Sequence, residues 1–325
     1  MVVVDHHFIP QFYLRGFRDP TTPEGQEPWL WVADLREQTI ERRAPKNVGK
    51  QANYYAFPAD GGTQIQAVEE MFQKIESSTA PVIAKLLCGD FRLSDEDRTS
   101  LSIFMAFFIT RVPWFRSLVE KSVGDIGRLM LRMTANRPEY FERKLRDVHE
   151  GKQQFTPEEV EELRQWTLDE TNYTLQGSPD LSLAMGIRVA PALVPILHDM
   201  KWAFLVPPEG VHFVTCDNPV SWVDPTPRPP FYRGSGLLMR KVELSFPVGP
   251  CLCLFAAWEG PSGAGEIPVR FVNELNRRRA LWADRFVFAD HGDGARDALE
   301  IRRTLEASRR EEIYPGSGRG RPGSS

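Results

Sequence analysis

The alternation of apolar and polar positions divides the chain into two strand-like ends and a helical middle. Near the N-terminus, "WLWVADL" (29–35) and "TIERRA" (39–44) flank a short turn, which is typical of a β-hairpin. From residue 65 to residue 87, apolar side chains recur with the 3.6-residue period of an amphipathic helix. After residue 200, short apolar runs return, and they predict further strands.

The helical middle carries two clear start signals. Ser94 followed by Asp97 resembles a capping box, and Thr156 followed by Pro157 combines a cap with a proline at the first helical position. The run at 101–110 is too short for a membrane span, which needs about 20 apolar residues. We therefore expect a buried helix there that packs against a sheet and bends or restarts at Pro113. Another helix is predicted over about 181–200.

The C-terminal third alternates again. Residues 202–208 and 211–219 look like a hairpin, strands follow at 241–249 and 251–258, and an amphipathic helix at 269–283 precedes a last strand at 285–289. Strands at both ends predict an α+β fold, in which one mixed or antiparallel sheet is built from N- and C-terminal strands. The helical block of about 65–200 would pack on that sheet. We expect a single domain over 1–313 and a disordered tail, rich in Gly, Ser, Pro and Arg, over 314–325.

Composition narrows the class of protein. Hydrophobic residues make up 42% of the 325, which is enough for a real core and excludes a disordered chain. A net charge of −4 argues against nucleic-acid binding through bulk charge and leaves a local basic patch open. The four cysteines have no CxxC spacing, and no signal peptide or membrane span is visible. We therefore expect reduced thiols, a cytoplasmic location and no membrane partner.

Two histidines open the candidate chemistry. In an extended segment, the adjacent side chains of His6 and His7 point to opposite faces, so one metal rarely binds both. One could act as a metal ligand or general base while the other pairs with a carboxylate; the alternative is a capped N-terminal segment. Asp217 and Asn218 follow a predicted strand and precede a proline. They could hold a metal or orient a substrate, or could simply form an Asx-turn.

Polar residues on two predicted helices add to this set. Glu69 and Glu76 lie seven residues apart on the same helix face, and Glu76 borders the core, where a carboxylate needs a partner. Arg111 or Arg116 could supply it, and a purely structural Glu–Arg pair is the alternative. Asn276 lies inside a predicted helix, where asparagine is unfavourable, so we expect its side chain to make a specific hydrogen bond. Residues 277–279, three arginines, are expected to form a solvated face.

No motif points to a nucleotide cofactor. "GKQANYY" lacks the Walker spacing, and "GSGLL", "GPSGAG" and "DHGDGARD" lack the strand–GxGxxG–helix context of a dinucleotide site. HExxH, GxSxG and paired CxxC motifs are also missing from the sequence.

Several segments resemble, in order, the bacterial family catalogued as domain of unknown function 4238. They are "HHFIPQFYLRGF" (6–17), "KNVGKQANYYAF" (46–57), "VEEMFQKIESSTAPVIAKL" (68–86), "FMAFFITRVPWFR" (104–116), "HFVTCDNPVSW" (212–222), "ELSFPVGP" (243–250) and "VNELNRRRALWADRFVFA" (272–289). One departure is Cys216, where the family usually has Ser; a thiol is the weaker hydrogen-bond donor. The resemblance implies no activity, so function rests on the residues.

The candidate residues converge if the two terminal strand regions form one sheet. His6, Asp217 and Asn218 would then meet at one edge, and the first long helix would bring Glu76 to it. We expect a divalent metal (Mg²⁺, Mn²⁺ or Zn²⁺) held by His6, Glu76 and Asp217. The expected catalytic residues are His6, His7, Asp217 and Arg111. The expected substrate-binding residues are Asn218, Asn276, Gln11 and Tyr55.

This site predicts a metal-assisted hydrolase, in which the metal activates water, the free histidine is the general base and Arg111 stabilises negative charge. A phosphodiester or nucleotide is the expected substrate, and a nucleic acid stays open as partner. The alternative is a non-enzymatic binding or interaction protein in which the His and Asp-Asn-Pro motifs are structural.

Overall fold

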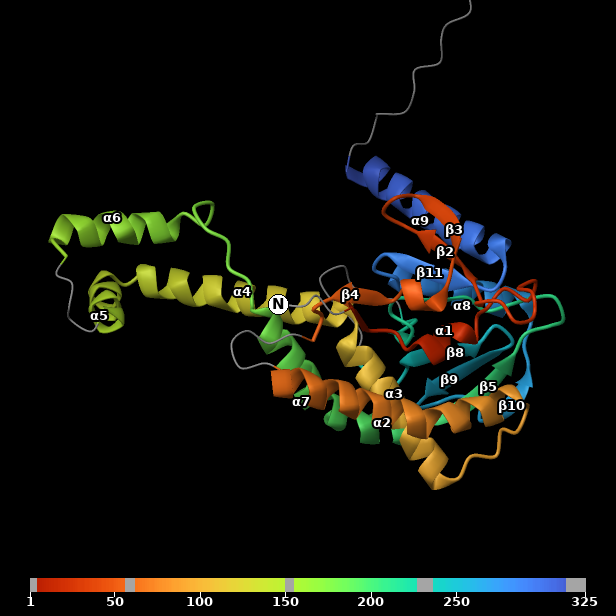
Figure 1. Ribbon diagram of the computed structural model, residues 1–325. Helices are drawn as coiled ribbons and strands as arrows, with labels where there is room; N and C mark the ends of the chain where they lie inside the picture. Colours follow the sequence, from red (N-terminus) through yellow and green to blue (C-terminus); the bar gives the residue numbers. More distant parts are fainter. Residues whose placement is uncertain (1–4, 56–61, 150–154, 227–235, 314–325) are drawn as a thin grey trace, which may run out of the picture. The chain divides into compact units, whose positions relative to one another are not determined.

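The structure is a computed structural model that describes residues 5–55, 62–149, 155–226 and 236–313 (Figure 1). Helices and strands are both well represented, so the predicted α+β class is confirmed. The tail predicted for residues 314–325 lies outside the described residues.

The chain divides into two compact units. The larger one combines Met1–Pro113 with Ile187–Ser325, and the smaller one is Trp114–Gly186. All described strands belong to the larger unit. The helical block expected over about 65–200 is therefore divided, because its first helices belong with the strands.

A four-stranded antiparallel sheet joins the two ends of the chain. Its strands are, in order across the sheet, β3 (Thr39–Arg43), β2 (Leu30–Asp34), β11 (Phe286–Ala289) and β6 (Thr215–Cys216). The pair β2–β3 is the predicted hairpin, which is confirmed. One face of this sheet packs on α8 (Val269–Trp282) and α9 (Gly292–Ile313) in a cluster of small apolar side chains.

A five-stranded sheet is the second sheet of the larger unit. Its order is β10 (Gly263–Glu266), β5 (Lys201–Val206), β9 (Leu252–Ala257), β8 (Glu243–Gly249) and β7 (Ser221–Val223). Every residue of β9 is buried, which explains its uninterrupted apolar run. A third, two-stranded sheet pairs β1 (Asp5–His7) with β4 (Lys50–Ala52).

Two expectations about the strands are wrong. The strands do not all form one sheet, since the described strands belong to three, although the four-stranded sheet does combine N- and C-terminal strands as expected. Residues 202–208 and 211–219 do not form a hairpin, because β5 pairs with β9 and β10, whereas β6 pairs with β11. The physical reason is that Pro207 and Pro208 follow β5 and have no N–H to continue a ladder, so the chain leaves that sheet.

The remaining helices of the larger unit surround these sheets. They are α1 (Gln11–Arg15), the 3₁₀ turn η1 (Pro45–Asn47), α2 (Gly62–Leu87) and α3 (Asp95–Arg111). The Ser94 side chain accepts the Asp97 N–H and the Asp97 side chain accepts the Ser94 N–H, which confirms the capping box. The ring centroids of Phe104 and Phe108 of α3 lie 6.2 and 6.0 Å, respectively, from the ring centroid of Phe246 of β8. Helix α3 therefore packs on the sheet as expected.

The smaller unit is helical. It contains α4 (Pro113–Ala135), α5 (Pro138–Val148), α6 (Pro157–Leu168) and the first residues of α7 (Pro179–Asp199). The capping box at Thr156 is confirmed. Arg116 is buried within this unit, where Nη2 donates to the Pro179 carbonyl at 2.9 Å and Nε donates to Ser182 Oγ at 3.2 Å.

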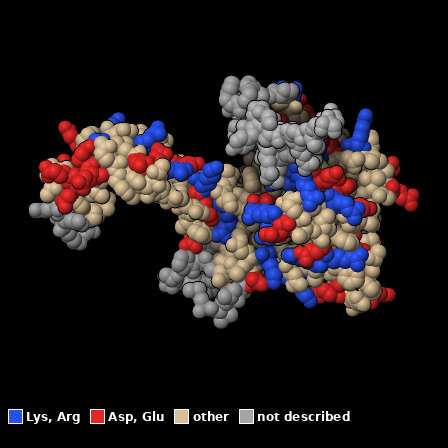
Figure 2. Space-filling model, turned by 90° about the horizontal axis from the view of Figure 1, so that it is seen from above, with Lys and Arg blue, Asp and Glu red and all other residues tan. Residues whose placement is uncertain are grey.

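The apolar character of one helix and the distribution of surface charge are relevant to which partners the protein could bind. Helix α7 is long and apolar enough to cross a membrane by length and composition, a test that core helices of other proteins also pass. On the face drawn in Figure 2, basic and acidic side chains of the described residues are intermixed. This distribution agrees with the small net charge of the chain.

Candidate functional site

Strand β1 places the two histidines in different surroundings. His6 is buried and His7 is half-buried, as expected for neighbours in an extended segment. His7 lines a pocket of about 300 Å³ beside α1 and α2. Four residues expected from sequence line it, namely His7, Gln11, Tyr55 and Glu76, and Pro10, Phe12, Glu69, Phe72 and Gln73 complete the wall.

The His7 ring presents an unprotonated nitrogen to this pocket. The Gln11 amide nitrogen donates to His7 Nε2 at 3.0 Å, so Nε2 carries the lone pair. Burial lowers the pKa of His7 below its ordinary value of 6.5; the positive charges of Lys50 and Arg111 lower it further, while the Val48 backbone and Asp5 oppose the shift. His7 is therefore neutral at pH 7, which is the state a general base requires.

His6 lies behind the pocket wall and faces Glu69. Its Nδ1 accepts the Tyr55 N–H at 3.4 Å, so in the neutral ring the proton is on Nε2. That Nε2 lies 3.2 Å from Glu69 Oε1. No hydrogen bond joins these two atoms, because His6 Nε2 has no hydrogen-bond partner among the described residues. His6 therefore faces the Glu69 carboxylate without fixing its orientation.

Arg111 holds the second carboxylate of the pocket. Its Nη1 donates to Glu76 Oε1 at 3.0 Å, so the expected Glu–Arg pair is confirmed, with Arg111 as the partner. The guanidinium is buried between the rings of Phe72 and Phe108, 5.0 Å from each centroid. Its Nε and Nη2 have no hydrogen-bond partner among the described residues. An arginine with spare donors beside a pocket is suited to an anionic ligand.

Asp217 does not line this pocket. Its carboxylate accepts three backbone N–H groups, from Asp284 at 2.8 Å, Arg285 at 2.6 Å and Phe286 at 2.8 Å. Burial raises the pKa of Asp217 to about 6, although these donors lower it. The expectation that His6 and Asp217 meet at one sheet edge is wrong, because β1 and β6 belong to different sheets.

The two predicted asparagines also contact the backbone. Asn276 Oδ1 accepts the Val214 N–H at 3.0 Å, and its Nδ2 donates to the His212 carbonyl at 2.8 Å. Asn218 is buried, its N–H donates to Cys216 Sγ at 3.4 Å, and its carbonyl accepts from that thiol at 3.1 Å. The Asn276 contacts tie the segment before β6 to α8, whereas the Asn218 contacts are local to the turn after β6. Neither asparagine lines the His7 pocket.

Arg279 was expected on a solvated face, and that expectation is wrong. Its side chain is fully buried and donates from Nη2 to Ser245 O at 3.1 Å and Ser245 Oγ at 3.0 Å, and from Nη1 to the Pro219 carbonyl. Arg277 and Arg278 do pair at the surface, with Glu274. Position on α8 separates them, because Arg279 lies on the face with Val272 and Leu275.

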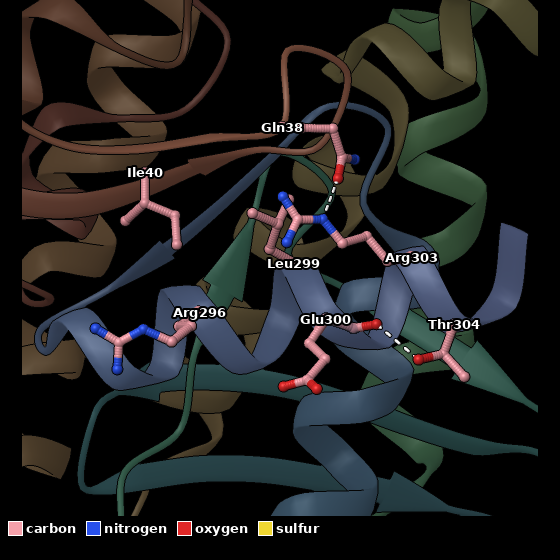
Figure 3. A pocket seen from close by; sticks show the side chains of 7 residues that line it. All are labelled: Gln38, Ile40, Arg296, Leu299, Glu300, Arg303 and Thr304. Carbon is pink, nitrogen blue, oxygen red and sulfur yellow. Dashed lines mark hydrogen bonds between the residues drawn. The ribbon is translucent and has the colours of Figure 1, made fainter. Parts of the chain in front are cut away.

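A larger hollow of about 770 Å³ lies between β3 and α9 (Figure 3). The side chains of Gln38 and Arg303 point toward each other there, and Gln38 Oε1 accepts from Arg303 Nε at 2.6 Å. Two of its polar side chains thus pair with each other. The His7 pocket instead combines a neutral imidazole with two carboxylates, of which Glu76 is held by Arg111.

Sequence reasoning missed several residues of the site. Glu69 was weighed as a partner of Glu76 along one helix face, but only the tertiary structure shows it opposite His6. Gln73 and Phe72 gave no signal, because a polar residue and a core aromatic on α2 are ordinary. His212, Asp290 and His291 form a separate cluster that the sequence analysis passed over as part of a glycine loop and a strand.

Comparison with known proteins gave one match. The family model described as "Protein of unknown function (DUF4238)" matches residues 5–293. No curated protein and no solved structure matched the chain.

Proposed function

The chain belongs to the DUF4238 family, and we propose that this member is a metal-assisted hydrolase. Its substrate is a phosphodiester or a nucleotide, and it cleaves a phosphate ester bond of that substrate in the His7 pocket. The observation that supports this most is the grouping of a neutral imidazole with two carboxylates around one cavity. Arg111 orients Glu76, and the buried His6 lies 3.2 Å from Glu69.

Glu69 and Glu76 are the residues that would hold the cation. Mg²⁺ and Mn²⁺ prefer oxygen ligands, and Mg²⁺ is commonly bound by one or two carboxylates together with substrate phosphate and water. Both carboxylates line the pocket, and neither is fully buried, so a hydrated ion can reach them. When bound, the cation supplies a lowered pKa for water and charge neutralisation at the phosphoryl oxygens.

The protein side chains have distinct tasks in this proposal. His7 takes the proton of the attacking water through its Nε2 after the Gln11 amide, which donates to that nitrogen in this structure, turns away and frees the lone pair. Arg111 adds positive charge beside the pocket where negative charge develops. A volume of about 300 Å³ is at the low end for small-molecule sites and favours a small ester over a duplex.

The test is a screen of the tag-free protein against generic phosphodiesters and nucleotides with Mg²⁺, Mn²⁺ or Zn²⁺. We expect His7→Gln to lower kcat by about 100-fold or more, the usual effect of losing a general base, while the melting temperature stays within a few degrees. Glu69→Gln should raise the metal concentration needed for half-maximal rate. His198→Gln, a half-buried histidine outside the pocket, is the control. Full activity in His7→Gln would overturn the proposal.

A second candidate function is a binding or interaction protein without turnover. The contacts of Asp217 and Asn276 favour it, because both residues satisfy backbone groups, as a structural role requires. The two functions separate in one experiment. A binding protein holds the ligand in the pocket and forms no product. In that case, His7→Gln changes only the affinity for the ligand.

A further inference from the structure

We infer that His212, Asp290 and His291 form a binding site for a divalent transition metal, separate from the His7 pocket. One ligand atom from each of the three residues lies within 4.8 Å of the others. Asp290 is nearly buried, and each of its oxygens faces one imidazole. Oδ2 lies 2.5 Å from His212 Nδ1, and Oδ1 lies 3.0 Å from His291 Nδ1.

The backbone around this cluster is held firmly before any ligand binds. Asp290 and His291 follow the last residue of β11 directly and precede α9, which starts at Gly292. A side chain at Gly292 would place Cβ 3.3 Å from the Trp31 ring, so the chain packs closely at this turn. Such a site loses little conformational entropy on binding.

His212 is positioned from a third element. It lies in the link between β5 and β6, and its carbonyl accepts from Asn276 Nδ2 at 2.8 Å. The same asparagine accepts the Val214 N–H. The in-helix asparagine that the sequence singled out therefore holds this loop, and with it His212, against α8.

The donor set indicates which cations fit. Two imidazoles and one carboxylate are borderline ligands that suit Zn²⁺, and also Mn²⁺, Fe²⁺ or Co²⁺, better than the hard ions Mg²⁺ and Ca²⁺. Three protein ligands leave a coordination position for water or another ligand. The cluster is open to solvent on one side, since the His291 side chain is 49% exposed and the His212 side chain 28%. A metal can thus enter without unfolding the loop.

The two imidazole rings are already close. Their centroids are 4.5 Å apart at an interplanar angle of 74°, on either side of the same carboxylate. Coordination through Nδ1 requires each ring to carry its proton on Nε2, so metal bonds would take the place of the two contacts between Nδ1 and the carboxylate. The Asp290 carboxylate then gains a dipositive partner.

The experiment is a calorimetric titration of Zn²⁺ into chelator-treated, tag-free protein at neutral pH. We expect one Zn²⁺ to bind at this cluster, and binding to weaken at least about tenfold in His291→Ala and Asp290→Asn. His291→Ala truncates an exposed side chain, so its fold should persist, and circular dichroism checks this. His198→Ala and Asp293→Asn are matched controls that remove a histidine and a nearby exposed carboxylate.

The His7 pocket supplies a further control. The residues of the two sites do not overlap, so His7→Gln and Glu69→Gln should leave this Zn²⁺ affinity unchanged whether or not the hydrolase proposal holds. Zn²⁺ should also raise the melting temperature of the parent protein and not that of His291→Ala. The inference fails if the parent binds no Zn²⁺, or if His291→Ala and Asp290→Asn bind it as tightly as the parent and control proteins.

Discussion

At the scale of single residues, the site depends on which ring nitrogen carries the proton. The backbone N–H of Tyr55 donates to His6 Nδ1, and the Gln11 amide donates to His7 Nε2, so the two neighbouring histidines present opposite chemical states. His6 Nε2 lies 3.2 Å from Glu69 without a hydrogen bond, whereas the lone pair of His7 Nε2 accepts from Gln11 at the pocket wall. Their roles follow from these partners and from the alternation of β1.

The pKa of His7 gives the first prediction. Burial and the positive charges of Lys50 and Arg111 lower the pKa of His7. When kcat/KM is plotted against pH, its fall on the acidic side should therefore have a midpoint below pH 6.5. Because the pKa of His7 is lower in the folded protein than in the unfolded chain, the unfolded chain binds the His7 proton more tightly. The contribution of His7 to the free energy of unfolding is therefore lost as the pH falls from 6.5 through the pKa of His7 in the folded protein. Lys50→Met should move the kcat/KM midpoint to higher pH. A pH–rate profile of both proteins checks this, and identical midpoints would contradict it.

At the scale of elements, Asp217 joins the end of β6 to the start of β11. One carboxylate accepts the N–H groups of three consecutive residues, 284–286, just where α8 ends and β11 begins. Such a contact holds the start of the strand in place, because a buried N–H group needs an acceptor. The Asp-Asn-Pro motif therefore organises the four-stranded sheet.

Asp217→Ala should destabilise the protein strongly. The change leaves three N–H groups in a buried site without their acceptor, and we expect a loss of about 3 kcal/mol or more in the free energy of unfolding. Denaturant unfolding measures it, with Asp199→Ala, an exposed carboxylate, as control. A loss as small as that of the control would show that the three contacts do not support the sheet.

At the scale of the whole molecule, the larger unit requires both ends of the chain. Strand β2 pairs with β11 across about 250 residues, and Tyr13 donates to the Pro247 carbonyl at 2.7 Å. The smaller unit, Trp114–Gly186, is closed by contacts among its own helices. Within it, α4 exposes several large apolar side chains, namely Leu118, Ile126, Leu129, Met130 and Met133.

This difference predicts uneven local stability. Few side chains of α4 are fully buried, whereas every residue of β9 is, so the amides of α4 should exchange with solvent deuterium much faster than those of β9. Hydrogen exchange followed by mass spectrometry resolves the two segments. Equal protection of α4 and β9 would count against two units of different stability.

The sequence was sufficient for most local structure. The capping residues Ser94 and Thr156 start helices because each satisfies N–H groups only three residues away. The Glu76–Arg111 pair could be predicted from the sequence as one of two options, because a carboxylate at the edge of a core needs a cationic partner. Helix α9 was missed because its glycine-rich start resembles a loop, although Ala295, Ala298 and Leu299 follow the helical period.

The sequence by itself determined most of the helices and strands and the opposite orientations of His6 and His7, because these depend on residues a few positions apart. Only the tertiary structure decided that the strands divide among three sheets, that Glu69 faces His6, that Arg279 is buried, and that His212 meets Asp290. Those contacts join residues far apart in sequence, and any buried polar group has many acceptable partners. Which one it meets is set by the packing of the whole chain.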